Sequence, residues 1–506
     1  MEHADTAQLA AVIGALGSAL ALLGGSRPAV LGGLAALALA EVGLAVGLSG
    51  TGQLDSILSP AGAVAGAVGL AVMAGAAALL VRRPALVPLC VLAAAPLRPP
   101  VSFDASSRFL VSVAEDGRLG RLLPLYFVLS AAALALGWRT LRGIETRPLP
   151  RSVAVPAAAF FAFAFLSLLW ADDLRSGTNL LVYFTLPFAV LLAVVARAEY
   201  PDWAPRALGG VAIALASLFA LVGLWQAVTH KLFFFAPNLA VSNANTDYFR
   251  VTSLFGDPSL YGRHLVLGIG VVLSVLAVRR MNPWHAIALL ALMWTGLLFS
   301  YSQSSMVALV VIALAIAAAA GDARVRRAVA VTAAVALLVA GGFVAAKVIS
   351  GSSLNRLTSD RTGRVEETAR VIREHPLIGV GIGGQPRASR DLAGSDRPTP
   401  NFVSHTTPLT VAAELGLVGL ALYGWLLVGG ARLLAAVYPR HRAMALSLGA
   451  AFLALFVHAL FYSGFLEDPL TWVVLAIGAG YLTSRPAEPT EPERGDMAGR
   501  RAALAS

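Results

Sequence analysis

Long apolar segments recur along the whole chain and alternate with shorter polar stretches. A helix needs roughly 20 apolar residues to cross a bilayer, and many of the segments have about that length. They lack the apolar–polar alternation over about ten residues that is typical of barrel strands. The pattern therefore predicts an all-α polytopic membrane protein with about 12–15 transmembrane helices. The candidate spans are residues 7–25, 28–48, 60–81, 84–97, 121–138, 153–170, 179–196, 207–229, 261–278, 285–301, 304–320, 328–349, 407–430, 443–464 and 469–484.

Composition supports the membrane assignment. The 506-residue chain is 58% hydrophobic and 13% charged, with a mean hydropathy of +0.75, which is too little charge to cover a soluble domain of this size. Cys90 is the single cysteine, so a disulfide framework and a cysteine-based metal site are both excluded. No basic stretch precedes residues 7–25, and we interpret this segment as a first span, not a cleaved signal peptide.

The arginines of the short loops predict the orientation of the chain. The net charge of +10 indicates contact with anionic membrane lipids, not with nucleic acid. Residues 1–484 are expected to form one transmembrane domain, and the Pro- and charge-rich tail at 485–506 is expected to be disordered in the cytoplasm. If the spans alternate, the basic groups that fall together on the cytoplasmic side are Arg82–Arg83, Arg139/Arg142/Arg147/Arg151, Arg279–Arg280, Arg324/Arg326/Arg327 and Arg440/Arg442.

Three longer segments, 98–120, 230–260 and 350–406, then lie on the extracytoplasmic side. The third is the most unusual, because eight arginines fall between residues 351 and 397. Its stretch TGRVEETARVIREHPL has helical character, with an apolar stripe formed by Val365, Ala369, Val371 and Ile372. We expect Pro376 to end that helix and the following GVGIGG to form a tight turn with exposed backbone amides.

This content suits chemistry on a phosphate. A guanidinium group donates two parallel hydrogen bonds to a phosphate and stays charged, and His405 at the mouth of the next span can take a proton near neutral pH. The alternatives are a basic loop that only binds lipid head groups, a structural histidine and an ordinary glycine-rich turn. Glu414 lies inside a span, where a carboxyl group needs a function or a buried partner.

The remaining polar residues support weaker hypotheses. Asn243, Asn245 and Asp247 could bind sugar hydroxyls or serve as turn residues. The adjacent Asp172 and Asp173 could hold a cation, but no further ligand spacing supports a metal site. The GVGIGG at 379–384 follows no strand, so it is not a dinucleotide-binding fingerprint.

The order of these motifs resembles a known family. An arginine precedes FGDPS, a later span ends in SYSQSS, and an arginine-rich helix is followed by HPLIGVGIGG and then by a histidine before AELGLVGL. Over roughly residues 160–430, this order is similar to the bacterial O-antigen ligase and O-antigen polymerase superfamily. The resemblance implies a membrane glycosyltransferase of the GT-C type that needs no metal ion or cofactor. It also implies a polyprenyl-pyrophosphate-linked glycan as donor and a glycan or glycolipid as acceptor.

The resemblance also implies roles for individual residues. His405 corresponds to the family's motif histidine, a general base or acceptor-orienting group. Arg250 corresponds to its first essential arginine, and Arg361 or Arg364 to its second; both arginines would hold the pyrophosphate. Candidate supporting residues are Glu414, Arg263 and Arg373.

The sequence departs from the family pattern at two motif positions, where Ser305 and Ser259 replace the usual arginine and asparagine. The usual aromatic residue after the second arginine is also missing. These departures leave the subfamily and the acceptor open.

We therefore expect a metal-independent inverting glycosyltransferase of the ligase type in the bacterial cytoplasmic (inner) membrane, with its active site on the extracytoplasmic side. One alternative is a polymerase that joins lipid-linked repeat units in polysaccharide biosynthesis. Others are a non-catalytic transporter or flippase of lipid-linked sugars, with charged or broken helices at the bilayer midplane, and a non-enzymatic envelope scaffold.

Overall fold

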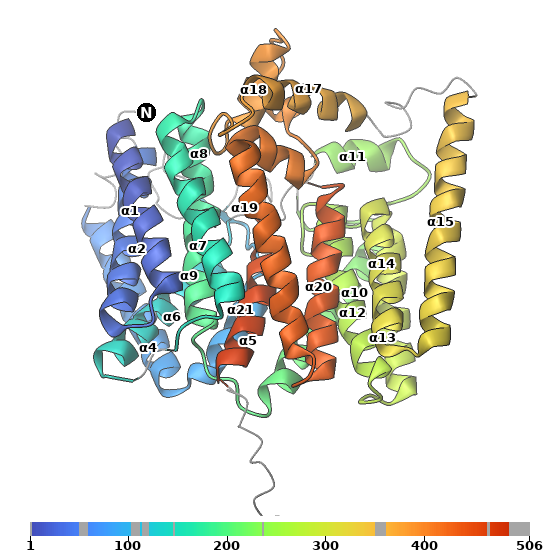
Figure 1. Cartoon of the computed structure of the whole chain (residues 1–506), viewed down its shortest axis with the longest axis horizontal. Helices are drawn as coiled ribbons and strands as arrows, with labels where there is room; N and C mark the ends of the chain where they lie inside the picture. The colour runs from blue at the N-terminus through green and yellow to red at the C-terminus, as the bar shows by residue number, and fades with distance from the viewer. Residues whose placement is uncertain are drawn as a thin grey trace, which may run out of the picture.

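The protein is a bundle of long helices with a small helical cap at one end (Figure 1). The computed structural model describes residues 3–49, 59–102, 112–113, 121–144, 147–234, 237–349, 361–462 and 466–484. Within these residues, 11 helices are long and apolar enough to cross a membrane, or 12 if one bent pair counts as a span. The all-α polytopic fold is therefore confirmed. The predicted cytoplasmic tail at 485–506 lies outside the described residues.

The first half of the chain builds one side of the bundle. Its helices share one large hydrophobic core with α19 and α21. Between α5 and α6, a two-residue antiparallel pair joins β1 (Val101–Ser102) to β2 (Ser112–Val113). The helices are α1 (Ala4–Leu23), α2 (Arg27–Leu48), α4 (Pro60–Arg82), η1 (Pro84–Leu86), α5 (Val87–Ala94), α6 (Leu123–Leu141), α7 (Arg151–Leu166), η3 (Ser167–Trp170), α8 (Leu174–Leu180), the π-helical turn η4 (Leu181–Thr185) and α9 (Leu186–Val195).

The second half adds a second core and the cap. The second core forms between α10, α12, α13, α14 and α20, while α15 packs against α14 at the edge of the bundle (Figure 1). The helices are α10 (Ala204–Thr229), α11 (Pro237–Ala244), α12 (Pro258–Ala277), α13 (Pro283–Ser300), α14 (Gln303–Ala320), α15 (Ala323–Ile349), α17 (Arg361–Glu374), α18 (Gln385–Leu392), η5 (Thr399–Phe402), α19 (Thr407–Val437), α20 (Arg442–Ala459) and α21 (Pro469–Ser484).

The prediction of a span at 84–97 is wrong. Helix α4 ends at Arg82, and the short η1–α5 segment that follows is bent by 107° from it. Pro84 causes the break, because proline has no backbone N–H and disfavours helical geometry in the residue before it. Arg83 accordingly has non-helical angles, with φ −132° and ψ 67°. The other predicted spans each coincide with helical structure.

The cap consists of α17, α18 and η5, which pack on one another and on the start of α19. Helix α17 ends at Glu374, two residues before Pro376, as the sequence predicts. Its buried face, however, centres on Thr368 and Val371, whereas Val365 of the predicted apolar stripe is exposed. The cap therefore holds α17 through a narrow face and leaves most of its charged residues outside the core.

Candidate functional site

Arg250 lies in a loop that is fixed from three directions. Its backbone N–H donates to Asn243 Oδ1 at 3.0 Å, and its carbonyl accepts from Asn243 Nδ2 at 3.0 Å. The guanidinium Nε donates to the Ser300 carbonyl at 3.4 Å. Fully buried Gln226 accepts from the N–H of Ser253 at 2.7 Å and donates to its carbonyl at 2.9 Å. Asn243 therefore has a positioning role in the structure, and the half-buried Arg250 is held at the end of α13.

The segment before His405 is fixed by the cap helices. Arg364 on α17 donates from Nη1 to the Val403 carbonyl at 3.2 Å. Gln385, the first residue of α18, accepts from the Ser404 N–H at 3.1 Å, and its Nε2 donates to the carbonyl of Phe402 at 3.0 Å. His405 itself is half-buried. The arginine helix and the histidine segment are thus one hydrogen-bonded unit.

Arg250 and this unit lie at the same end of the bundle. Asn243, which binds Arg250, belongs to α11, and Arg364 belongs to α17. Figure 1 shows α11, α17 and α18 along one end of the molecule. The loop of Arg250 and the segment before His405 are thereby on one side of the bundle.

The expectation of exposed amides in the glycine-rich turn is wrong. Residues 379–384 are buried, and their amides bond within the protein. Gly381 N–H donates to the Glu414 carbonyl at 2.8 Å, and Ile382 N–H donates to Ser167 Oγ at 3.1 Å. An added Cβ at Gly381, which has φ +83°, would lie 2.3 Å from Ala171 Cα. These glycines allow the turn to wedge between α19 and the η3–α8 corner, so the turn is not a phosphate cradle.

Glu414 on α19 contacts the glycine-rich turn. Its side chain is buried, and its carboxyl group faces the backbone N–H groups of Gly383 and Gln385. Two residues later, α19 is kinked at Gly416, with φ 66° and ψ −167°. These contacts give the buried carboxyl group polar neighbours in the cap; a supporting role of Glu414 at the site remains a prediction.

Arg263 has a partner that the sequence did not indicate. Its Nη2 lies 2.5 Å from Asp468 Oδ2, and the two side chains are 9% and 2% exposed. Burial lowers the pKa of Arg98. The nearby negative charge of Asp468 opposes this shift, and the nearby positive charge of Arg263 adds to it. Arg263 and Asp468 therefore form a buried ion pair, and Arg98 is close enough to feel the charges of both.

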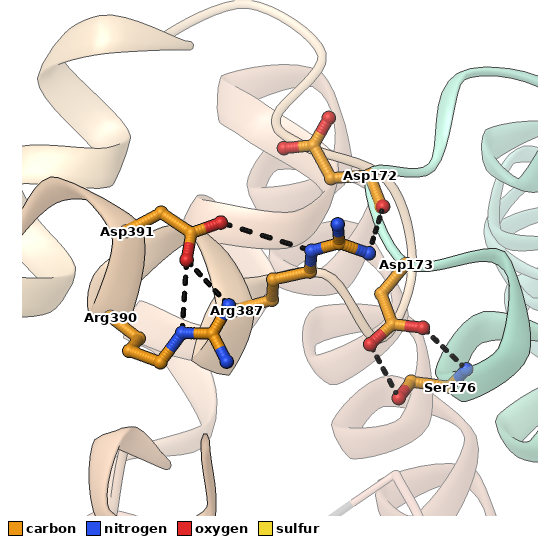
Figure 2. Close-up of polar contacts among 6 residues, drawn as sticks. All are labelled: Asp172, Asp173, Ser176, Arg387, Arg390 and Asp391. Carbon is orange, nitrogen blue, oxygen red and sulfur yellow. Dashed lines mark hydrogen bonds and ion pairs between the residues drawn. The ribbon is translucent and has the colours of Figure 1, made fainter. Parts of the chain in front are cut away.

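The paired aspartates of the α7–α8 corner have structural partners. Asp173 caps α8, accepting from the Ser176 N–H and Oγ, each at 3.0 Å. The Asp172 carbonyl accepts from Arg387 Nη1 at 3.2 Å. Figure 2 shows Arg387 bridging from this corner to Asp391, which also pairs with Arg390 at 2.7 Å. These contacts tie α18 to the first half of the bundle and give two of the loop arginines a structural role.

The two remaining predicted arginines are less defined. Arg373 is exposed, and its Nε donates to the Ala369 carbonyl at 3.3 Å within its own helix. Arg361 is the first residue of α17, and its side chain lies outside the described part of the structure. The roles of Arg250, Arg361, Arg364 and His405 remain predictions.

Comparison with protein families gives a match to part of the chain. Residues 288–424 match the family described as O-Antigen ligase. This stretch runs from α13 to the kinked α19 and contains α17, the glycine-rich turn and His405. A search of curated proteins finds no match for the chain.

Proposed function

We propose that the protein is a metal-independent inverting glycosyltransferase; the match of residues 288–424 to the O-antigen ligase family supports a glycan ligase or polymerase type of activity. It takes a glycan from a polyprenyl-pyrophosphate carrier and transfers it to a cell-envelope glycan or glycolipid. The observation that carries the proposal is the 3.2 Å bond from Arg364 to Val403. It joins an arginine helix to the histidine segment at the end of the bundle that also holds Arg250.

In the proposed reaction, the acceptor hydroxyl attacks the anomeric carbon while the bond from that carbon to the pyrophosphate oxygen breaks. His405 removes the hydroxyl proton. Arg250, together with Arg364 or Arg361, neutralises the charge that develops on the leaving pyrophosphate. Because guanidinium groups supply this positive charge, the reaction needs no divalent ion.

The bilayer holds the prenyl chain of the donor, so the protein has to orient only the pyrophosphate, the sugar and the acceptor. The side-chain hydrogen bonds to the backbone around Arg250 and His405 suit that task. Asn243 and Gln226 fix the backbone around Arg250, and Gln385 fixes the segment before His405. The basic short loops of the sequence fall at the opposite end of the bundle, which supports an extracytoplasmic site in the cytoplasmic membrane.

The test is transfer in proteoliposomes that contain a polyprenyl-pyrophosphate oligosaccharide and an acceptor, with excess EDTA present. His405→Ala is expected to lower the transfer rate by about 10²- to 10⁴-fold, the range for loss of a general base. His375→Ala is the matched control, because His375 is exposed in the same cap. Equal rates in wild type and His405→Ala, or a requirement for divalent metal, would contradict the proposal.

A second arm tests the arginines and the transporter alternative. Arg364→Gln is expected to lower the rate, whereas Arg390→Gln serves as control because Arg390 pairs with Asp391. Movement of the labelled donor across the bilayer without any glycosidic product would instead favour a transporter. Product length separates ligation, which adds one glycan, from polymerisation, which yields a ladder.

A further inference from the structure

A second site lies away from the cap, in the seam between the two hydrophobic cores. A cavity of about 380 Å³ separates α10 from α20 and α21, and α5 and α12 complete its walls. Its wall residues are mostly apolar, among them Leu208, Val271, Met444, Val474 and Ile477. Protein interiors seldom leave voids much larger than a water molecule, and this volume falls in the range of ligand-binding cavities.

The charged residues of the cavity gather at one end. Arg206 lies in the first turn of α10, Arg280 follows the end of α12, and His441 caps the start of α20. Figure 1 places these helix ends opposite to α17 and α18. The cavity is therefore apolar along its length and cationic at the end that faces away from the proposed active site.

The hydrogen bonds of His441 define the polar contacts at the cationic end of the cavity. Its Nδ1 accepts from the Met444 N–H at 3.1 Å, so in the neutral ring the proton is on Nε2. That Nε2 lies 3.2 Å from Arg280 Nη1, which is also a donor. Arg280 and His441 thus meet at this end of the cavity, and the further N–H groups of the Arg280 guanidinium can donate to an anionic oxygen.

We propose that this cavity binds an anionic phospholipid from the leaflet at that face. Its phosphate lies among Arg206, Arg280 and His441, and an acyl chain fills the apolar seam between α10 and α21. The exposed arginines at the helix ends match the depth at which lipid head groups meet a membrane protein. A free phosphate would occupy only the cationic end and would leave the apolar walls without a partner. We therefore assign the cavity to a lipid that carries an acyl chain.

The glycines of α10 keep the seam open. Gly209 lines the cavity, and an added Cβ there would meet only Val271 Cγ1 at 3.8 Å. At Gly210, also in the wall, an added Cβ would meet nothing within 4 Å. A larger side chain at Gly209 would therefore enter the cavity without displacing backbone.

The charge arm of the test measures lipid retention by native mass spectrometry. Purified full-length protein in detergent is mixed with phosphatidylglycerol or with phosphatidylcholine of the same chains. Wild type is expected to bind phosphatidylglycerol at least tenfold more tightly. The double variant Arg206→Gln/Arg280→Gln is expected to lose that preference, and the control Arg324→Gln/Arg327→Gln, which removes two exposed arginines at the start of α15, is expected to keep it.

The second part of the test reduces the volume of the cavity with a larger side chain. Gly209→Leu is expected to weaken binding of both lipids about tenfold, whereas Gly424→Leu, at a position where a Cβ also meets nothing within 4 Å, is expected to leave binding unchanged. If the double arginine variant does not fold, Arg280→Gln alone is used, with a smaller loss of preference expected.

Three results would overturn the inference. The first is equal binding of the two lipids by wild type. The second is an unchanged preference in the arginine variants. The third is displacement of phosphatidylglycerol by undecaprenyl phosphate to the same extent in wild type and in Arg206→Gln/Arg280→Gln, which would identify the cavity as a groove for a prenyl tail.

Discussion

The buried ion pair of Arg263 and Asp468 allows a test of how the structure places charge inside the bundle. Asp468→Asn removes the ion-pair partner of Arg263 while keeping its size, and it leaves Glu467 as a carboxyl group near Arg98. Arg263→Gln removes one cation and leaves Asp468 beside Arg98. The two substitutions break the same 2.5 Å contact but leave different charges behind, so the structure predicts unequal costs.

The expected magnitudes follow from burial. Because the paired side chains are 9% and 2% exposed, solvent screens the pair little. Loss of Asp468 leaves Arg263 buried without its ion-pair partner, and removing one partner of a buried pair costs about 3–5 kcal/mol. Loss of Arg263 removes the ion pair but leaves Arg98 as a nearby cation for Asp468, so we expect a smaller cost, comparable to that of one hydrogen bond to a charged group, about 1.5–3 kcal/mol. Asp468→Asn should therefore cost about 2 kcal/mol more, taking the midpoints of these ranges.

The assay is reversible unfolding in mixed detergent and dodecyl sulfate micelles, followed by the fluorescence of the eight tryptophans. The double variant Arg263→Gln/Asp468→Asn should be about as stable as Asp468→Asn, because removing Arg263 relieves the repulsion that loss of Asp468 creates. Arg139→Gln is the control: its partner Glu199 is 58% exposed, and exposed pairs contribute about 0.2–1 kcal/mol. Additive costs, or a larger cost for Arg263→Gln, would refute the reasoning.

Three further predictions concern the residues that hold the site. Gln226→Ala leaves the N–H and carbonyl of Ser253 without their partner and should destabilise the protein by at least about 1–3 kcal/mol, measured by the same unfolding titration. Gly416→Ala should lower the free energy of unfolding by more than about 1–2 kcal/mol, because the residue has φ 66° and the new Cβ would lie 2.2 Å from the Leu377 carbonyl oxygen. An unchanged unfolding midpoint would contradict the kinked geometry of α19 at this residue. Glu414→Gln should speed hydrogen exchange at the amides of residues 383 and 385, and unchanged exchange would show that the carboxylate does not hold the wedge.

The spans could be predicted because bilayer thickness sets their length. A run of apolar residues near that length is local information, and the helices from α6 to α10 follow it closely. The end of α17 was equally predictable, since Pro376 acts on the residues beside it. The break at Pro84 was available in the sequence too, but the hydrophobic run at 84–97 outweighed it in the prediction.

The packing of the cap could not be predicted in this way. The glycine-rich turn looks like an open anion-binding turn from its sequence, and only contacts with Ala171 and Glu414, both distant along the chain, show that its glycines serve close packing. Asp468 and Arg98 were missed for the same reason, because 370 residues separate them and no local pattern links them. Gln226 was missed because a lone glutamine in an apolar helix carries no signal of the loop that it binds.

The most direct test of the proposed function is an experimental structure of the protein with an intact polyprenyl-pyrophosphate glycan or a non-hydrolysable analogue. Our account predicts the pyrophosphate oxygens within hydrogen-bonding distance, about 2.7–2.9 Å, of the guanidinium groups of Arg250 and of Arg364 or Arg361, with His405 facing the anomeric carbon from the acceptor side. A pyrophosphate bound at the opposite end of the bundle, or one that contacts neither Arg250 nor the α17 arginines, would contradict it.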